Sequence, residues 1–354
     1  MFFRRLLLPF SWIYALVTVV RNKLFDAGIL PSTSYPLPVI SVGNITVGGT
    51  GKTPLTEHLI RLLQPHHRIA LLSRGYGRKT KGVIVADHNA TYESIGDEPM
   101  QMKQKFPNLL VVVAEKRTLG MDVLLAQSSP PDIILMDDAY QHRYVQPGLS
   151  ILVTDYHRPM WKDLCFPAGN LREPASGIER SQMVVVSKCP KDLSLDEAQM
   201  IQKKLKVSPH QKVFFSAIDY GEPKQLVSSD STTSFKETLN KSSHPLTVVA
   251  GIGNPKPFFK RAELFGMPIK TMRYKDHHHF SASDLKEIEM SALSTDDTYG
   301  LILTTEKDAV RLSASEHLTE TLAQLIWYIP IQPEFLIDGE NAFNETILNY
   351  IKRT

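Results

Sequence analysis

The chain has 354 residues, 42% of them hydrophobic, and a formal net charge of +3. This length suits one large or two ordinary globular domains, and so small a net charge gives no reason to expect a nucleic-acid partner. The only two cysteines, Cys165 and Cys189, cannot form a disulfide framework. Any functional signal must therefore lie in local groups of residues.

The chain begins with an apolar segment over residues 6–20 that has arginine or lysine residues on both sides. It is about five residues shorter than the roughly 20 that span a bilayer, and Pro9 interrupts its first turn. A secretory signal peptide is disfavoured because no small-residue cleavage site follows Val20. A helix buried in the core stays open. We favour a helix within residues 1–25 that lies in a membrane interface, its flanking cations drawn to anionic headgroups.

A glycine-rich turn follows an apolar strand that we predict over residues 39–42, and a helical pattern over 55–63 comes after the turn. Glycines allow successive backbone N–H groups to turn inward around phosphate oxygens, and the positive end of the helix dipole points at the same anion. This order of parts predicts a cradle for a nucleoside triphosphate. Its residues are Thr46, Val47, Gly48, Gly49, Thr50, Gly51, Lys52 and Thr53.

Two side chains at the end of this turn have expected roles. Lys52 is expected to reach the outer phosphates, and the hydroxyl of Thr53 is expected to hold Mg²⁺. Thr46 departs from the usual pattern, because a glycine normally stands at its position, and we expect Gly48 and Gly49 to supply the missing freedom. ATP and Mg²⁺ are therefore the predicted ligands.

Apolar runs alternate with helical patterns as far as residue 218, which predicts an α/β fold like that of the P-loop NTPases, a mostly parallel sheet with helices on both faces. Further core strands are expected over 69–72, 109–113, 133–136, 151–153 and 183–186. The polar residues 219–245 are predicted to form a linker after a core of residues 26–218. A second strand-and-helix pattern over 246–354 predicts a smaller C-terminal lobe that closes over the site.

Two acids, Asp137 and Asp138, end a predicted buried strand. A carboxylate at this place lies beside the phosphates, where it can hold Mg²⁺ directly or through water, and Asp137 is the leading candidate. Gln141 and His142 follow in the same polar cluster. Because open α/β sheets bind ligands at the carboxyl ends of their strands, we predict that both face the substrate.

Basic residues are needed wherever phosphates bind, and the planar fork of arginine matches phosphate oxygens. Arg74 lies near Tyr76 in a glycine-containing loop, where a solvated surface and a contact with the substrate are equally open. Arg117 and Arg172 are stronger candidates. One of them is expected to neutralise charge on the transferring phosphoryl group, and the sequence leaves the choice between them open.

Six ordered blocks of the chain together resemble the tetraacyldisaccharide 4′-kinase family, the lipid A kinases of Gram-negative bacteria. The blocks cover residues 43–54, 73–78, 96–99, 137–142, 167–174 and 305–310. The family usually has Gly-Phe before Gln-His, where this chain has Ala139 and Tyr140. The resemblance runs from the N-terminal apolar segment nearly to the C-terminus.

This resemblance implies a lipid kinase that transfers the γ-phosphate of ATP to the 4′-hydroxyl of a tetraacylated glucosamine disaccharide 1-phosphate, forming lipid IVA in lipopolysaccharide biosynthesis. It also implies an enzyme at the cytoplasmic face of the bacterial inner membrane. Its expected partners are this acylated disaccharide and the membrane surface, with no obligatory protein partner.

The resemblance further implies roles for residues whose local sequence is uninformative. Asp97, otherwise one acid of a solvated turn, becomes the base for the attacking hydroxyl, and Glu98 becomes a residue that can approach Mg²⁺. His277 is expected to reach across from the C-terminal lobe and pair with Asp97. It is the first of three consecutive histidines. Adjacent side chains point in divergent directions, which disfavours a zinc site.

Two other functions share part of this pattern. A membrane-associated partitioning or targeting ATPase also combines such a loop with a membrane-associating helix, but these proteins normally carry a lysine where this chain has Val47. A non-catalytic ATP-binding scaffold is disfavoured by the number of acids and cations at strand ends.

Overall fold

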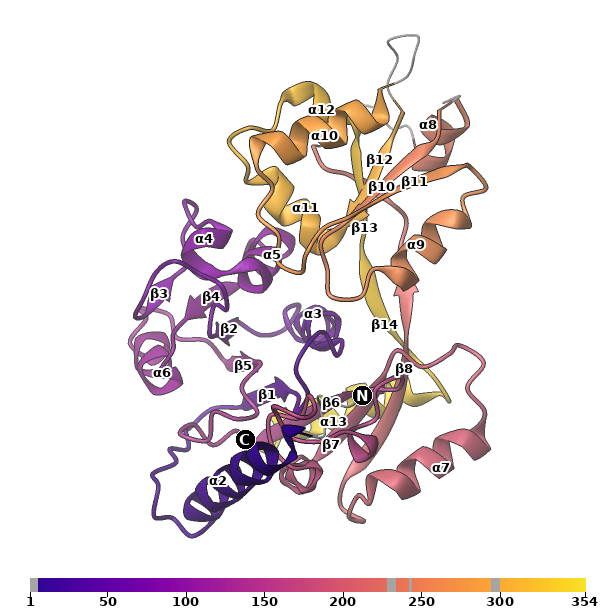
Figure 1. Cartoon of the computed structure of the whole chain (residues 1–354). Helices are drawn as coiled ribbons and strands as arrows, with labels where there is room; N and C mark the ends of the chain where they lie inside the picture. Colours follow the sequence, from indigo (N-terminus) through magenta and orange to yellow (C-terminus); the bar gives the residue numbers. More distant parts are fainter. Residues whose placement is uncertain (1–5, 228–233, 242–243, 294–299) are drawn as a thin grey trace.

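The structure is a computed structural model that describes residues 6–227, 234–241, 244–293 and 300–354. It consists of a larger N-terminal lobe, which we call the core, and a smaller C-terminal lobe, joined by a pair of antiparallel strands (Figure 1). Each lobe has a sheet covered by helices. The predicted α/β fold, with a mostly parallel sheet and helices on both faces, is confirmed.

The sheet of the core has nine strands in the order β14-β8-β7-β6-β1-β5-β2-β4-β3. The strands are β1 (Val39–Gly43), β2 (Ile69–Ser73), β3 (Ile84–Val85), β4 (Leu110–Val113), β5 (Ile133–Asp137), β6 (Leu149–Asp155), β7 (Met183–Ser187), β8 (Lys212–Tyr220) and β14 (Ile331–Phe335). Only the pairings of β3 and β14, at the two edges, are antiparallel. All six core strands expected from the sequence are present, as β1, β2, β4, β5, β6 and β7.

Helices cover both faces of this sheet because alternate residues of each strand point to opposite sides. Ile40 and Val42 of β1 belong to the same buried cluster as residues of α3 (Lys52–Leu63), α5 (Asp97–Lys105) and α13 (Gly339–Ile351). Val39 packs with α6 (Arg117–Leu125) on the other face, where α7 (Leu195–Leu205) also lies. The short helix α4 (Tyr92–Ile95) precedes α5. The carboxyl end of β1 is therefore held rigidly between two packed layers.

The C-terminal lobe has a five-stranded sheet in the order β11-β10-β12-β13-β9. Its strands are β9 (Lys224–Gln225), β10 (Leu246–Ala250), β11 (Ile269–Arg273), β12 (Ile302–Thr305) and β13 (Ile326–Ile329). Its helices are α8 (Phe235–Lys241), α9 (Lys256–Glu263), α10 (Ala282–Ala292), α11 (Glu306–Ser313) and α12 (Glu320–Leu325). Two separate clusters of buried apolar residues, one on each side of the sheet, give this lobe its own hydrophobic interior.

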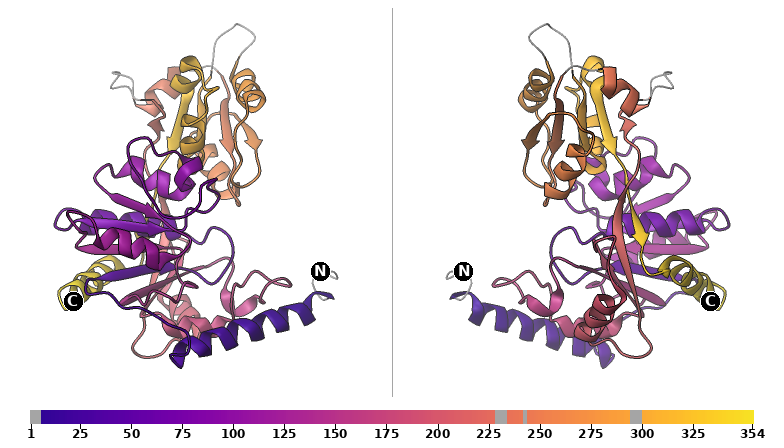
Figure 2. Two further views of the ribbon diagram at one scale, coloured as in Figure 1. Left: turned by 90° about the vertical axis from the view of Figure 1, so that its left-hand side faces the viewer. Right: turned by 90° about the vertical axis from the view of Figure 1, so that its right-hand side faces the viewer.

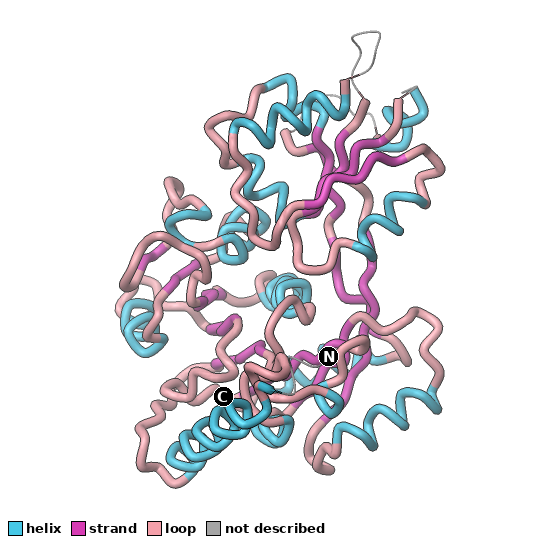
Figure 3. The backbone as a smooth tube through the Cα atoms, viewed as in Figure 1, coloured by secondary structure: helices cyan, strands magenta, loops and turns pink. Residues whose placement is uncertain are grey.

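The boundaries between the lobes differ from those expected. Strand β9, inside the expected linker 219–245, pairs with β13, and Phe235 of α8 is buried in the C-terminal lobe. Conversely, β14 pairs with β8, and Phe343 of α13 packs in the core, so the end of the chain returns to the core (Figure 3). Hydrophobic patterns locate helices and strands but do not say which sheet they join. Expected linker residues 228–233 and 242–243 lie outside the described part.

The N-terminal helix α2 (Leu8–Asp26) lies along the outside of the core, at the end away from the C-terminal lobe (Figure 2). One face carries apolar side chains that are at least 60% exposed, those of Phe10, Trp12, Ile13, Leu16 and Val17. Such exposure contradicts the alternative of a helix buried in the core. None of the described helices combines the length and apolar character needed to cross a bilayer.

Candidate active site

The predicted phosphate loop connects β1 to α3, with Lys52 as the first residue of the helix. Gly51 precedes the helix with a φ of 88°, in the left-handed region that favours glycine. Asn44 fixes the loop from inside, because its amide donates to the carbonyl of Thr46 at 2.7 Å and to Thr50 Oγ1 at 2.8 Å. No side chain caps the backbone N–H groups at the start of α3. These N–H groups therefore suit an anion.

The structure explains why threonine is accepted at position 46. Residues 45–47 pair with the segment 170–172: Val47 N donates to the carbonyl of Asn170 at 2.8 Å, and Arg172 N donates to the carbonyl of Ile45 at 2.7 Å. Thr46 lies between them in a β-bridge with Leu171. An extended backbone suits a β-branched residue, so glycine is not required there.

Two acids at the end of β5 lie beside α3. Asp137 is 2% exposed, and the hydroxyl of Thr56 donates to it at 3.4 Å. Asp138 has a φ of 46°, and its carboxylate lies 3.5 Å from Lys52 Nζ and 3.0 Å from Arg172 Nη1. Burial, together with the charges of Glu98 and Asp138, raises the pKa of Asp137 to about 7.

These donors fit Mg²⁺, which prefers carboxylate, hydroxyl and phosphate oxygens. The buried Asp137 carries no ion pair with a cation among the described side chains, which suits a carboxylate that meets a metal ion. Within the described ranges, no three acidic, histidine or cysteine side chains converge to form a metal cage by themselves. An ion bound near Asp137 and Thr53 would therefore take further ligands from phosphate and water.

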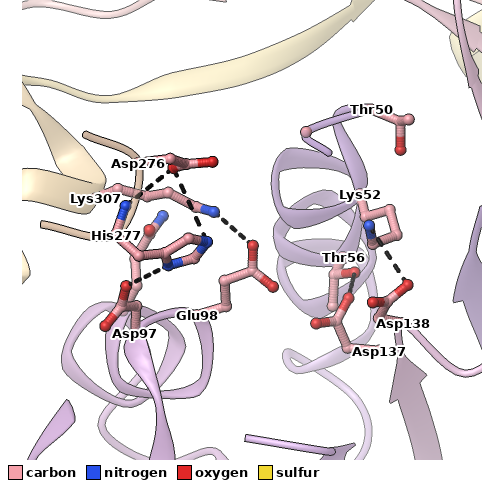
Figure 4. Close-up of polar contacts among 12 residues, drawn as sticks. Thr50, Lys52, Thr56, Asp97, Glu98, Asp137, Asp138, Asp276, His277 and Lys307 are labelled. Carbon is pink, nitrogen blue, oxygen red and sulfur yellow. Dashed lines mark hydrogen bonds and ion pairs between the residues drawn. The ribbon is translucent and has the colours of Figure 1, made fainter. Parts of the chain in front are cut away.

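Helix α5 begins with the two acids of the third block. Gly96 precedes them with a φ of 93°, and a side chain there would approach the carbonyl of Tyr76 at 2.8 Å. Asp97 Oδ2 lies 2.8 Å from His277 Nδ1 of the C-terminal lobe. Glu98 accepts a hydrogen bond from Lys307 Nζ at 2.5 Å. Figure 4 shows these two contacts on one side of the site and the acids of β5 on the other.

The three consecutive histidines point to three different partners. His277 has a φ of 57° and lies 5.6 Å, between ring centroids, from Tyr76 of the core. His278 contacts Asp284 at 2.9 Å within its own lobe, and His279 lies 3.2 Å from the hydroxyl of Tyr92. The structure therefore brings His277, and neither of its neighbours, to Asp97.

The two acids of α5 remain charged in this environment. Burial by itself raises the pKa of Asp97, but the hydrogen bond with His277 and the charge of Arg311 outweigh it and hold the pKa below its usual value. The ammonium of Lys307 lowers the pKa of Glu98 in spite of burial. Acids whose pKa values are shifted in opposite directions, as at Asp97 and Asp137, are typical of catalytic sites.

The two arginine candidates have different surroundings. Arg117 is 2% exposed, and its guanidinium donates to the carbonyls of Ala114 at 2.7 Å and Asp137 at 3.4 Å, so it braces the ends of two strands. Arg172 is partly exposed and pairs with Asp138, next to Lys52. Arg172 is thus the arginine that lies beside the charged residues of the phosphate site.

The four residues expected to bind substrate fall into two pairs. Gln141 donates to the carbonyl of Asn44 at 2.8 Å, and His142 Nε2 accepts from the backbone N–H of Arg117 at 3.2 Å. Burial and nearby arginines lower the pKa of His142 to about 4, so this histidine is neutral with its proton on Nδ1. Arg74 and Tyr76 are exposed, and Tyr76 lies next to His277.

Several residues of this site had no role predicted from the sequence. Asn44 and Glu173 hold the phosphate loop and Gln141, and Lys307 and Arg311 contact the acids of α5. Asn44, Glu173 and Lys307 lie in the blocks that carry the family resemblance, but their spacing carries no chemical signal. Arg311 follows Asp308 by three residues, a spacing that usually belongs to an exposed helix face.

Comparisons with known proteins agree on one family. A family model described as tetraacyldisaccharide-1-P 4′-kinase matches residues 3–352. A tetraacyldisaccharide 4′-kinase of Flavobacterium johnsoniae is 46% identical over 349 residues, 99% of this chain and 97% of that protein. One of Bacteroides thetaiotaomicron is 43% identical over 352 residues, 98% of this chain and 93% of the relative. The crystal structure of the "apo" form of LpxK from Aquifex aeolicus in complex with ATP superimposes with a TM-score of 0.76, at 28% identity and 99% coverage of both chains.

Proposed function

Because the chain belongs to the tetraacyldisaccharide 4′-kinase family, we propose that it uses the site between its lobes to phosphorylate a glucosamine disaccharide lipid. It is an ATP-dependent kinase of lipid A biosynthesis. The acceptor is the 4′-hydroxyl of the tetraacylated disaccharide 1-phosphate, and the products are lipid IVA and ADP. The observation that supports this most directly is the 2.8 Å contact of Asp97 with His277, opposite the phosphate loop.

The residues of the loop and of β5 hold the nucleotide in this proposal. Backbone N–H groups of residues 48–53 surround the phosphates, whereas the N–H of Val47 is already bonded to the carbonyl of Asn170. Lys52 contacts the outer phosphates. Thr53 and Asp137, with Glu98 and Asp138 nearby, would hold Mg²⁺, which would supply positive charge against the phosphate oxygens. Arg172 lies where it can leave Asp138 and contact the transferring group, while Arg117 supports the strand ends.

A carboxylate of this chain accepts the proton that the attacking hydroxyl loses. The oxygen of the 4′-hydroxyl forms a bond to the γ-phosphorus, and the bond from that phosphorus to the bridging oxygen of ADP breaks. The hydroxyl proton passes to Asp97, whose ionised state is maintained by its cationic neighbours. His277 holds Asp97 in position and shares its proton. Tyr76, Gln141 and His142 border the place where the sugar lies.

We further propose that the enzyme works at the cytoplasmic face of the inner membrane. The exposed apolar face of α2 would lie among acyl chains. Helix α2 also contacts the site, because the Tyr14 hydroxyl donates to the carbonyl of Arg172 at 2.9 Å and Arg21 donates to that of Gln141 at 3.2 Å. A cavity of about 250 Å³ between α2 and residues 160–175 is lined by Leu8, Trp12, Met160 and Trp161, among others. It suits part of an acyl chain.

The direct test uses ATP labelled at the γ-phosphate and a tetraacylated disaccharide 1-phosphate in mixed micelles. We expect a labelled lipid, and we expect Lys52→Ala to lower its rate of formation by on the order of 10³-fold, because the transferring phosphates lose their nearest cation. A partitioning ATPase would release labelled phosphate and form no labelled lipid. Near-normal turnover of Lys52→Ala would contradict the role of the phosphate loop.

A further inference from the structure

Arg311 is the most completely buried charged residue that contacts the proposed base. Its side chain is 0% exposed although it lies at the junction of the two lobes. Nε donates to Asp97 Oδ2 of the core at 2.8 Å. Nη1 donates to Asp308 Oδ1 at 2.9 Å and to the carbonyl of Gly251 at 3.0 Å, both within the C-terminal lobe.

The C-terminal lobe orients this guanidinium by itself. Asp308 is anchored at the start of α11, where its second oxygen accepts from the backbone N–H of Gly251 at 2.9 Å and from the hydroxyl of Thr305 at 2.6 Å. Because Asp308 and Gly251 hold one end of the planar guanidinium, the direction of Nε is set by the lobe. Arg311 therefore presents one donor to the core, and that donor meets Asp97.

Both contacts from the C-terminal lobe fall on the same oxygen of Asp97. His277 Nδ1 and Arg311 Nε each lie 2.8 Å from Oδ2. Two partners at one oxygen fix the rotation of the carboxylate and leave Oδ1 as the oxygen that can accept the proton of the acceptor hydroxyl. A carboxylate held by His277 alone could still rotate about the bond that carries it.

We infer that Arg311 is a positioning residue of the transfer reaction: it orients Asp97 so that Oδ1 faces the acceptor hydroxyl, and it can do so only while the C-terminal lobe is docked on α5. This inference rests on the proposed role of Asp97 as the base. Because Arg311 belongs to the C-terminal lobe and Asp97 to the core, Arg311 can orient the base only when the two lobes are docked. Efficient phosphoryl transfer therefore requires the docked arrangement.

The alternative is that Arg311 merely helps the lobes to adhere. The same interface contains two other ion pairs, Lys307 with Glu98 at 2.5 Å and Lys105 with Glu306 at 2.6 Å. Glu306 lies on α11 as Arg311 does, but its partner Lys105 is at the far end of α5 from Asp97. Glu306→Gln therefore removes an interlobe charge pair of the same interface without a direct contact to the base.

The test compares Arg311→Lys with Glu306→Gln in the full-length enzyme. Lysine keeps the charge but cannot contact Asp97, Asp308 and Gly251 together. We expect kcat of Arg311→Lys to fall by on the order of 10²-fold, as misplacement of a reacting group does. KM for lipid and Kd for ATP should stay within about threefold, and Glu306→Gln should keep a kcat within about threefold of the wild type. Rates are expressed per ATP-binding protein, so that unfolded material does not count.

A double-mutant cycle tests whether Arg311 acts through Asp97. If it does, Arg311→Lys in an Asp97→Asn background lowers kcat by less than about threefold further, because the carboxylate it orients is absent. Independent, multiplying losses would overturn the inference, and so would an equal loss of kcat in Glu306→Gln. Asp308→Asn, which keeps Arg311 but weakens its hold, should lower kcat in the same direction. Unchanged kcat in this variant and in Arg311→Lys would also overturn it.

The outcome also separates this inference from the proposed function. A slow Asp97→Asn enzyme together with a normal Arg311→Lys enzyme would refute the inference alone. Normal turnover of Asp97→Asn would refute the role of Asp97 as base, whatever Arg311 does.

Discussion

Two residues of the site have a left-handed backbone conformation that residues other than glycine rarely adopt. His277 has a φ of 57° and Asp138 a φ of 46°. Such conformations cost on the order of 1 kcal/mol or more each, and they persist where neighbouring contacts hold them. At His277 the turn separates the directions of three successive imidazoles. At Asp138 and at His277 this conformation belongs to a residue whose side chain contacts other residues of the site.

This geometry predicts different effects for matching substitutions in the histidine run. His277→Asn should lower kcat by on the order of 10²-fold, because Asp97 loses the partner 2.8 Å away that shares its proton. His279→Asn is the control, since His279 contacts the Tyr92 hydroxyl at the surface. Steady-state lipid phosphorylation measures both. Equal losses in the two variants would mean that the whole loop matters and that no single imidazole acts on Asp97.

Two helices from different lobes form the charged part of the site. Helix α5 begins with two acids, where the positive end of the helix dipole stabilises them. Helix α11 presents Lys307 and Arg311 four residues apart, on one face, to these acids. Each acid therefore meets its own cation. One short helix therefore contacts both the base and the acid that can approach the metal.

Because the exposed apolar face of α2 is expected to contact lipid, substitutions on this face should change KM for the lipid and leave KM for ATP unchanged. The double substitution Trp12→Ser and Leu16→Ser removes two side chains that are more than 60% exposed, so the fold should be unaffected. Loss of about 2 kcal/mol of apolar contact per side chain with the lipid phase should raise KM for micellar lipid at least tenfold. KM for ATP should stay the same.

The matched control for this variant is Leu264→Ser, which removes an equally exposed leucine, 74% exposed, from the C-terminal lobe. It should leave both KM values unchanged. Vesicle flotation gives a second readout, because the α2 variant should bind less to anionic vesicles. An α2 variant that binds vesicles and lipid normally would contradict the interfacial role of this helix.

The two lobes are connected by the antiparallel strands β8 and β14. The chain crosses to the C-terminal lobe after β8 and returns through β14 before ending in α13 (Figure 1). Phe343 of α13 lies between these strands and α3, with ring centroids 5.3 Å from Phe214, 4.6 Å from Phe335 and 5.8 Å from His58. The end of the chain thus stabilises both the bridge between the lobes and the helix that follows the phosphate loop.

This packing predicts a large loss of stability for Phe343→Ala. Removal of a fully buried phenylalanine should lower the free energy of unfolding of the core by about 3–5 kcal/mol. Glu345→Ala, at an exposed position of the same helix, should change it by less than about 0.5 kcal/mol. Urea denaturation measures both. A small effect of Phe343→Ala would mean that α13 adds little to the core.

Short stretches of sequence were enough to predict the local parts of this protein. They predicted six of the nine strands of the larger sheet, the phosphate loop and the acids that end β5, and they favoured an exposed first helix without deciding it. Each of these depends on a few consecutive residues: alternating apolar positions, glycines before a helix, or a carboxylate after a buried run. The family resemblance added Asp97 and His277, whose local sequences carry no distinctive pattern.

Contacts between distant residues became visible in the folded chain alone. Packing placed β14 and α13 in the core, brought His277 and neither of its two neighbours to Asp97, and brought the buried Arg311 to a carboxylate 214 positions away in the chain. Contacts of this kind depend on how whole elements pack against one another. Since packing is decided by the fit of surfaces far apart in the chain, no short pattern of residues contains it.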